Sequence, residues 1–316
     1  MTYIATTLSN EKIDLGPAYS CEINKSREAP ADSLTAVFFS NKKHAQYKFI
    51  EVYTSENNLF FSGIVDEQTF EINNSGCFLK IKSRSKAAIL VDNEANPQTY
   101  KRPSLELIFH RHIKPYGFTS ISGNKSTFNA TIEVENGMSE WDVLAQFCSS
   151  CLHTFPVVHA NGSIDATSSF ALSKLSFSNN QNGINYSAIR QKYNRYKLIS
   201  EIIVCEPYAP IYVERVKEQN LIDNGISRRK FISMSEDTSI AEKISIETAE
   251  NMIQDAKNKF NEINITCPGD VFAQIGNRAQ VNDSILGQVD NLTVYEIEYN
   301  LAQNGEFTTF TLREEY

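Results

Sequence analysis

Cys148 and Cys151 form a Cys-Ser-Ser-Cys sequence, and His153 follows two residues later. Two thiols at this spacing could act as a redox dithiol or supply half of a zinc site. A redox dithiol needs its cysteines at the start of a helix, and a structural zinc site usually needs a second pair. Here the pair falls late in an expected helix, and the other cysteines are isolated. We therefore predict that both thiols are small apolar core residues.

The sequence His110-Arg111-His112 offers two imidazoles to a metal ion. Residues two apart on a helix point about 200° apart, so one ion cannot easily take both rings. His112 shares the apolar face of the expected helix, whereas His110 does not. We predict a packed His112 and a surface His110.

The remaining candidates for catalysis or binding are charged. Glu133 and Glu135 alternate along an expected strand and could form the carboxylate pair of a glycosidase, but the solvated face of an amphipathic strand explains them as well. The basic cluster 228–230 (Arg-Arg-Lys) is predicted to be a solvated loop, with contact to an acidic partner as the alternative. No nucleophile elbow and no phosphate-binding glycine loop occur. We predict no catalytic, cofactor-binding or metal-binding residue.

The elements that must position these residues belong to a globular chain. Its 316 residues suggest about two domains. Apolar residues make up 41% and charged residues 22%, which is enough for a sizeable core, and 11% aromatic residues favour β structure. The net charge of −8 argues against a protein that grips nucleic acid through its phosphates. No signal peptide and no run long enough to span a membrane are visible, so production in the cytoplasm with reduced thiols is expected.

The first hundred residues have the alternation and turn signals of β structure. A turn at 73–76 (Asn-Asn-Ser-Gly) joins the last two of five expected strands. Together these strands predict a small barrel or sandwich. They are expected at 34–40, 47–54, 59–65, 68–72 and 78–83.

Three helices are expected from apolar residues at helical spacing. The first runs from Ser104 to Lys114 and ends at Pro115 and Gly117. The second begins at Ser139, with Asp142 as its capping-box partner. The third runs over 245–260.

β structure alternates with these helices. The sequence at 128–134 (FNATIEV) alternates without a fault, and 198–205, 292–301 and 307–312 are also β-like. The last two are separated by Asn304-Gly305, a strong hairpin signal. The sequence thus predicts β structure first, then a mixed α/β segment, then β structure with one helix.

Short motifs in a fixed order carry a family resemblance. The sequence has Ser62-Gly63, then Ser83-Arg84, then Leu90-Val91-Asp92, then Pro115-Tyr116-Gly117-Phe118. Further on come Asn161-Gly162 and Pro268-Gly269-Asp270. This order resembles the baseplate hub family of contractile phage tails and tail-like bacteriocins, the late control D proteins. The first sixty residues and 178–195 match no motif of that family.

The resemblance implies a mainly β fold with an α+β insert. It would have a first tube-like β-barrel domain at 1–100, which the middle segment could interrupt, a mixed α/β domain at 101–190, and a second tube-like barrel with one helix at 191–316. Gly63, Arg84, Asp92, Tyr116, Gly117, Gly162 and Gly269 would be structural motif residues.

The resemblance also implies a function without catalysis or cofactors. Such hubs are homotrimers whose six barrels form a pseudo-hexameric ring between the hexameric tail tube, or a tube-initiator protein, and the trimeric central spike. They belong to a virion or tail-like particle assembled in the bacterial cytoplasm. In a phage, DNA passes through the bore, and three copies would carry 3 × (−8) = −24, which would repel the DNA backbone and let it slide.

Two other functions fit parts of the sequence. Tyr186, Tyr193 and Tyr196 could form the aromatic platform of a carbohydrate-binding module on a tail tip. The cysteine pair with His153, together with scattered carboxylates, could belong to a cell-wall or metal-dependent hydrolase.

Overall fold

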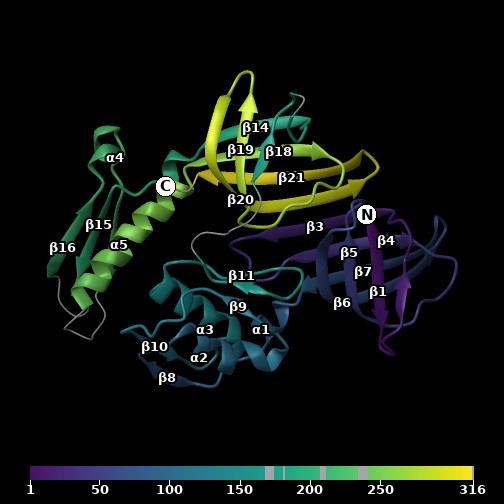
Figure 1. The fold of residues 1–316 in the computed structure, drawn as a ribbon, viewed down its shortest axis with the longest axis horizontal. Coiled ribbons are helices and arrows are strands. Elements are labelled where there is room, and N and C mark those ends of the chain that lie inside the picture. The colour runs from purple at the N-terminus through teal and green to yellow at the C-terminus, as the bar shows by residue number, and fades with distance from the viewer. Residues whose placement is uncertain (168–173, 181, 207–210, 234–240, 315–316) are drawn as a thin grey trace.

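The fold was taken from a computed structural model, which describes residues 1–167, 174–180, 182–206, 211–233 and 241–314. It is mainly β, as predicted, and its largest element is one mixed but predominantly antiparallel sheet (Figure 1). Seven strands come from the first 85 residues: β1 (Thr2–Thr7), β2 (Lys12–Asp14), β3 (Ser20–Ser26), β4 (Ser33–Phe39), β5 (Tyr47–Tyr53), β6 (Leu59–Asn73) and β7 (Gly76–Ser85). Six come from the second half: β13 (Leu175–Phe177), β14 (Ala188–Tyr193), β18 (Asn261–Pro268), β19 (Arg278–Asp283), β20 (Gly287–Ala302) and β21 (Gly305–Glu314).

The sheet joins the two halves of the chain without interruption. Its strand order is β14-β18-β21-β20-β3-β4-β7-β6-β5-β1-β2, and β19 connects β13 to β20. The halves meet where β20 pairs antiparallel with β3, with Glu298 opposite Asn24. In Figure 1 the strands from β14 to β3 lie side by side across this junction.

Period-two alternation places one face of the sheet in a large apolar core. On β3, Cys21 and Ile23 are buried and Glu22 and Asn24 are exposed. Ile23 lies between its cross-strand partners Leu34 and Tyr299, which are both buried, so side chains of the two halves share this core.

The five strands expected in the first hundred residues correspond to four. The segments predicted at 34–40, 47–54 and 78–83 are β4, β5 and β7, and the hairpin turn before Gly76 is confirmed. The segments at 59–65 and 68–72 form the single strand β6. A bulge between Val65 and Glu67 interrupts this strand, which pairs with β5 from Leu59 to Ile64 and with β7 from Gly63 to Asn73. The polar residues at the bulge interrupt the alternation of apolar and polar side chains, which is why the sequence suggested a turn between two strands.

A mixed α/β unit follows β7 and has its own apolar core. Its capping box at Ser139 and Asp142 is confirmed: each residue bonds to the backbone N–H of the other. The elements are α1 (Ala88–Asp92), β8 (Gln98–Lys101), α2 (Leu105–Ile108), β9 (Ile121–Ser122), β10 (Thr131–Val134), α3 (Glu140–Phe147), β11 (Val157–Val158) and β12 (Ile164–Asp165).

The first expected helix is not a uniform α-helix. It begins at Ser104, whose Oγ accepts from the Leu107 N–H, and continues as a π-helix over Phe109–Ile113 and a 3-10 turn over Lys114–Tyr116. Gly117 ends it with a φ of +81°, which a glycine adopts without strain. The widened turn brings Phe109, His112 and Ile113 all to buried positions. The strand predicted at 128–134 is shorter and is limited to β10.

A third unit is inserted into the sheet between β14 and β18. Tyr193 and Asn261 are direct cross-strand partners, so residues 194–260 form an excursion from one hairpin. In its apolar core, the long helix packs against the central strand. The strand predicted at 198–205 is confirmed only from Glu201 onward. The elements are β15 (Glu201–Cys205), β16 (Tyr212–Lys217), α4 (Gln219–Asp223), β17 (Arg229–Ser233) and α5 (Ala241–Asn258), seen at the left of Figure 1.

Candidate functional site

The cysteine pair is part of the core, as predicted. Cys148 and Cys151 lie in a π-helix that continues α3, and both are buried in the core of the α/β unit. Burial raises the pKa of the Cys148 thiol to about 12 and that of Cys151 to about 11, so both stay protonated at neutral pH. Among the residues that the structure describes, no group of three His, Cys, Asp or Glu side chains could hold a metal ion.

The two histidines behave as their helical positions predict. The His110 side chain is exposed, whereas His112 is buried. His112 Nε2 lies 2.7 Å from the Tyr100 hydroxyl and Nδ1 lies 2.5 Å from Glu140. Tyr116, one of the motif residues, donates a hydrogen bond of 3.0 Å to the same carboxylate. This buried network fixes the start of α3 against the preceding helical segment.

The other charged and aromatic candidates do not form a site for chemistry. Glu133 is exposed on β10, as predicted for the solvated face of a strand, and Glu135 is exposed just after the strand ends. Tyr186 is buried and donates to Asp283, so it cannot join Tyr193 and Tyr196 in an exposed platform. The alternative of an aromatic platform built from all three tyrosines is therefore wrong. The cluster 228–230 is exposed, with its last two residues in β17.

The motif residue Arg84 clamps β7 to two neighbouring elements. Its Nε and Nη2 atoms donate to Asp66 on β6 at 2.9 and 3.0 Å. Nη1 and Nη2 donate to Asp92 at the end of α1, at 3.0 and 2.8 Å. These two forked pairs raise the pKa of Arg84 and lower that of Asp92. The clamp thus ties the sheet to the α/β unit, and Asp66 is the partner that no motif marked.

Gly63 lies directly beside this clamp. A Cβ atom at this position would lie 2.4 Å from the Arg84 carbonyl oxygen and 2.6 Å from the Ser83 hydroxyl. Real Cβ atoms do not approach backbone this closely, so the pairing of β6 with β7 requires glycine here.

Lys86 brings two further motif residues to the same junction. Its Nζ donates to the Gly117 carbonyl at 2.5 Å and lies 4.6 Å from the centre of the Phe118 ring. The lysine also borders Gly162, which has a φ of +81°. Gly63, Arg84, Asp92, Gly117 and Gly162 therefore gather where the sheet meets the α/β unit. Sequence reasoning missed Lys86, although it lies two residues after Arg84.

Gly269 lies at a second junction, between the two halves of the sheet. Its carbonyl accepts from the Thr308 hydroxyl at 2.7 Å. The next residue, Asp270, accepts from the Ser55 hydroxyl at 2.8 Å and pairs with the N-terminal amino group of Met1 at 3.7 Å. The motif residue thus shapes a loop that contacts the first half.

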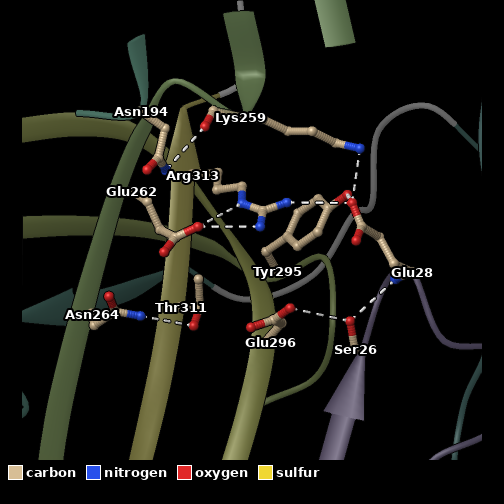
Figure 2. A network of polar contacts seen from close by, with 10 residues as sticks. All are labelled: Ser26, Glu28, Asn194, Lys259, Glu262, Asn264, Tyr295, Glu296, Thr311 and Arg313. Atoms are coloured by element: carbon tan, nitrogen blue, oxygen red, sulfur yellow. Dashed lines mark hydrogen bonds and ion pairs between the residues drawn. The ribbon is translucent and has the colours of Figure 1, made fainter. Parts of the chain in front are cut away.

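A third junction centres on Arg313, which no sequence signal marked (Figure 2). This arginine is buried, donates to Glu262 on β18 at 3.2 and 3.4 Å, and stacks 3.7 Å from the centre of the Tyr295 ring. Its Nη1 also lies 3.6 Å from Glu28, which accepts from Tyr295 and pairs with Lys259 at 2.8 Å. The network joins the two halves of the sheet to the root of the inserted unit.

Replacing Arg84 by lysine is expected to lower the free energy of unfolding by about 1 kcal/mol, because one ammonium group cannot make both forked contacts and the site is partly exposed. Asp92 has a lowered pKa in the folded state, so its contribution is present above the pKa of the unfolded carboxyl and is lost as the pH falls through the folded value. Urea unfolding near pH 7 and at about pH 3 measures both effects. The exposed Arg190 on β14, changed to lysine, is the control, and an equal loss there would contradict the clamp.

No family model and no curated protein sequence matches this chain. Several solved structures share its fold. A tail protein from Neisseria meningitidis MC58 superposes with a TM-score of 0.78 at 18% identity, over 100% of this chain and 97% of the other. The 43 kDa tail protein of prophage MuSo2 from Shewanella oneidensis gives 0.77 at 17%, over 99% and 98%.

A more distant structure has the same fold. The c3393 protein of Escherichia coli, described as a component of the type VI secretion system, gives a TM-score of 0.56 at 8% identity, over 95% of this chain and 73% of the other. At these identities the likeness shows a shared fold, and the assignment to the late control D family stays a prediction. No helix in the described part of the chain is long and apolar enough to cross a membrane.

Proposed function

We propose that this chain is a structural baseplate hub of the late control D type. Three copies form a pseudo-hexameric ring that adapts a hexameric tail tube to a trimeric central spike. The hub performs no catalysis, and the ring belongs to a virion or tail-like particle. The observation that carries the proposal is a continuous sheet that spans both halves of the chain and has a polar outer face where the two halves meet.

This polar face can be followed across the strands by their register. Arg84, Ser33 and Asn24 are successive partners on β7, β4 and β3, and Glu298 and Thr309 continue the row on β20 and β21. None of these side chains is buried. Directly opposite residues share one face of a sheet, so the row runs over the junction between the halves. A face of this kind suits the wall of a water-filled channel.

Acidic side chains lie near the middle of the polar face. Glu22 and Glu298 are exposed there, and Glu296 is the next outward residue on β20. In the ring, three copies of this surface would give the bore a negative wall, which repels a DNA backbone instead of holding it. Transient passage of DNA is therefore part of the proposal for a phage.

In this proposal, the two halves of the sheet act as the repeat that the ring needs. We assign the first tube-like barrel to 1–100, the mixed α/β domain to 101–190 and the second tube-like barrel to 191–316. Two barrels in each of three subunits present six similar surfaces to the tube and leave threefold symmetry for the spike. Tail proteins and a type VI secretion component share this fold, which supports a place in a tail-like assembly.

We expect the purified protein to have a mass of three times 35.7 kDa in solution and to form rings with a central channel. Light scattering at several concentrations gives the mass, and electron microscopy of negatively stained particles gives the shape. A protein that stays monomeric at every concentration and forms no ring would contradict the hub function.

A further inference from the structure

The inserted unit at 194–260 presents a sheet face that the ring proposal does not use. Its three strands lie in the order β16-β15-β17, and α5 packs against one face through Ile202 and Val204. The other face, here called the open face, carries the alternate residues Glu201, Ile203 and Cys205 of the central strand. Glu201 and Ile203 are themselves buried, so the exposed part of this face consists of side chains on the flanking strands β16 and β17.

One end of the open face is basic. Glu201 lies between its cross-strand partners Lys217 and Arg229. Its carboxylate accepts from Arg229 Nε at 2.5 Å and lies 3.2 Å from Arg215 Nη1 and 3.9 Å from Lys217 Nζ. These cations lower the pKa of Glu201, which is therefore charged at neutral pH.

Arg215, Lys217 and Arg229 thus share the single carboxylate of Glu201, so these four side chains together carry a net charge of +2. The side chains of Arg215, Lys217 and Arg229 are 47%, 47% and 53% exposed. Because Glu201 already orders them, a further carboxylate could bind with little loss of side-chain freedom. The arrangement is unexpected on a chain with a net charge of −8.

The other end of the open face is apolar. Tyr212 and Phe231 are both more than half exposed, and their rings lie 6.2 Å apart. Phe231 is the cross-strand partner of Ile203, directly beside the Glu201 position. Large exposed apolar groups next to charged ones are typical of protein interaction sites.

We propose that the open face binds a partner protein through an amphipathic acidic segment, whose carboxylates meet the three cations and whose apolar side chains pack on Tyr212 and Phe231. Charge complementarity selects the acidic occupant. Single-stranded nucleic acid is less favoured, because the chain as a whole carries a net charge of −8, which repels a long polyanion. Because the inserted unit leaves the large sheet at the hairpin between β14 and β18, the proposal for the open face does not depend on whether the protein forms a ring.

Binding of a fluorescein-labelled 12-residue peptide of alternating Glu and Leu or Phe to the full chain tests the proposal by fluorescence anisotropy. We expect saturable binding that weakens with added salt, and at least tenfold weaker binding by the pair Arg215→Gln and Lys217→Gln and by the pair Tyr212→Ser and Phe231→Ser. The pair Lys42→Gln and Lys43→Gln removes the same charge from exposed positions on the first half and should bind normally.

A second measurement uses the unmodified protein and so does not depend on the folding of any variant. The same peptide with Gln in place of Glu should bind at least tenfold more weakly. Equal binding of the two peptides, no binding of either, or an equal loss in the Lys42 and Lys43 control would overturn the proposal. Tighter binding of a 20-residue oligothymidylate than of the acidic peptide would overturn it in favour of nucleic acid. Each of these results tests binding at the open face and has the same meaning whether the protein is monomeric or trimeric.

Discussion

Replacing Arg313 by methionine is expected to lower the free energy of unfolding by about 3 kcal/mol. Methionine keeps an apolar side chain of similar length and removes the guanidinium group, whose Cζ lies 3.7 Å from the centre of the Tyr295 ring. Glu262, whose side chain is only 15% exposed, then loses the cation that lies 3.2 Å away. A partly buried carboxylate without its cation carries a desolvation cost that nothing offsets.

A double-mutant cycle with Glu262→Gln separates this interaction from lost packing. The double variant should be less destabilised than the sum of the two single variants by about 1–3 kcal/mol, because each single change removes the same contact. Urea unfolding followed by circular dichroism measures all four proteins. If the two losses simply add, the pair with Glu262 contributes nothing and Arg313 stabilises the junction through Tyr295 and Glu28.

Local signals in the sequence predicted much of the secondary structure. The capping box at Ser139 and the Asn304-Gly305 hairpin depend on neighbouring residues, and both are present in the structure. The burial of Cys148 and the exposure of His110 followed from helical periodicity alone. Such features need no knowledge of distant strands, which is why a single sequence is enough to place them.

Features that depend on distant residues were not predictable. The partners of Arg313 come from positions 28, 262 and 295, and no local pattern brings them together. Lys25 is a clearer example of a feature that depends on distant residues. It occupies an inward position on β3, and burial lowers the pKa of its ammonium group. Its Nζ bonds to the Phe60 carbonyl and lies 4.0 Å from the centre of the Phe60 ring. A charged residue at an inward position reads as a break in the strand pattern, and β3 was missed.

The motif residues at the α/β junction were found for a different reason. Gly63, Arg84 and Asp92 were singled out by family resemblance, and the structure supplies their physical cause. Arg84 can bridge Asp66 and Asp92 only if β6 and β7 lie close together at Gly63. These three motif residues therefore belong to one packed junction, whereas the acidic partner on β6 sits inside a bulge that no motif covers.

Replacing Gly63 by alanine is expected to cost about 3 kcal/mol or more, because the new Cβ would overlap the Arg84 carbonyl at 2.4 Å and either β6 or β7 must move. Movement of β7 would also pull Arg84 away from Asp92. A suitable control is Gly137→Ala, where the glycine has a φ of +87° and open space around it, so only backbone strain of about 1 kcal/mol is expected. Thermal unfolding followed by circular dichroism compares the two variants.

Adding Ser83→Ala to the Gly63→Ala variant removes the hydroxyl at 2.6 Å but leaves the Arg84 carbonyl, so it should not restore stability. Full recovery in that double variant would show that the side chain of Ser83, and not the close approach of the two backbones, makes glycine necessary.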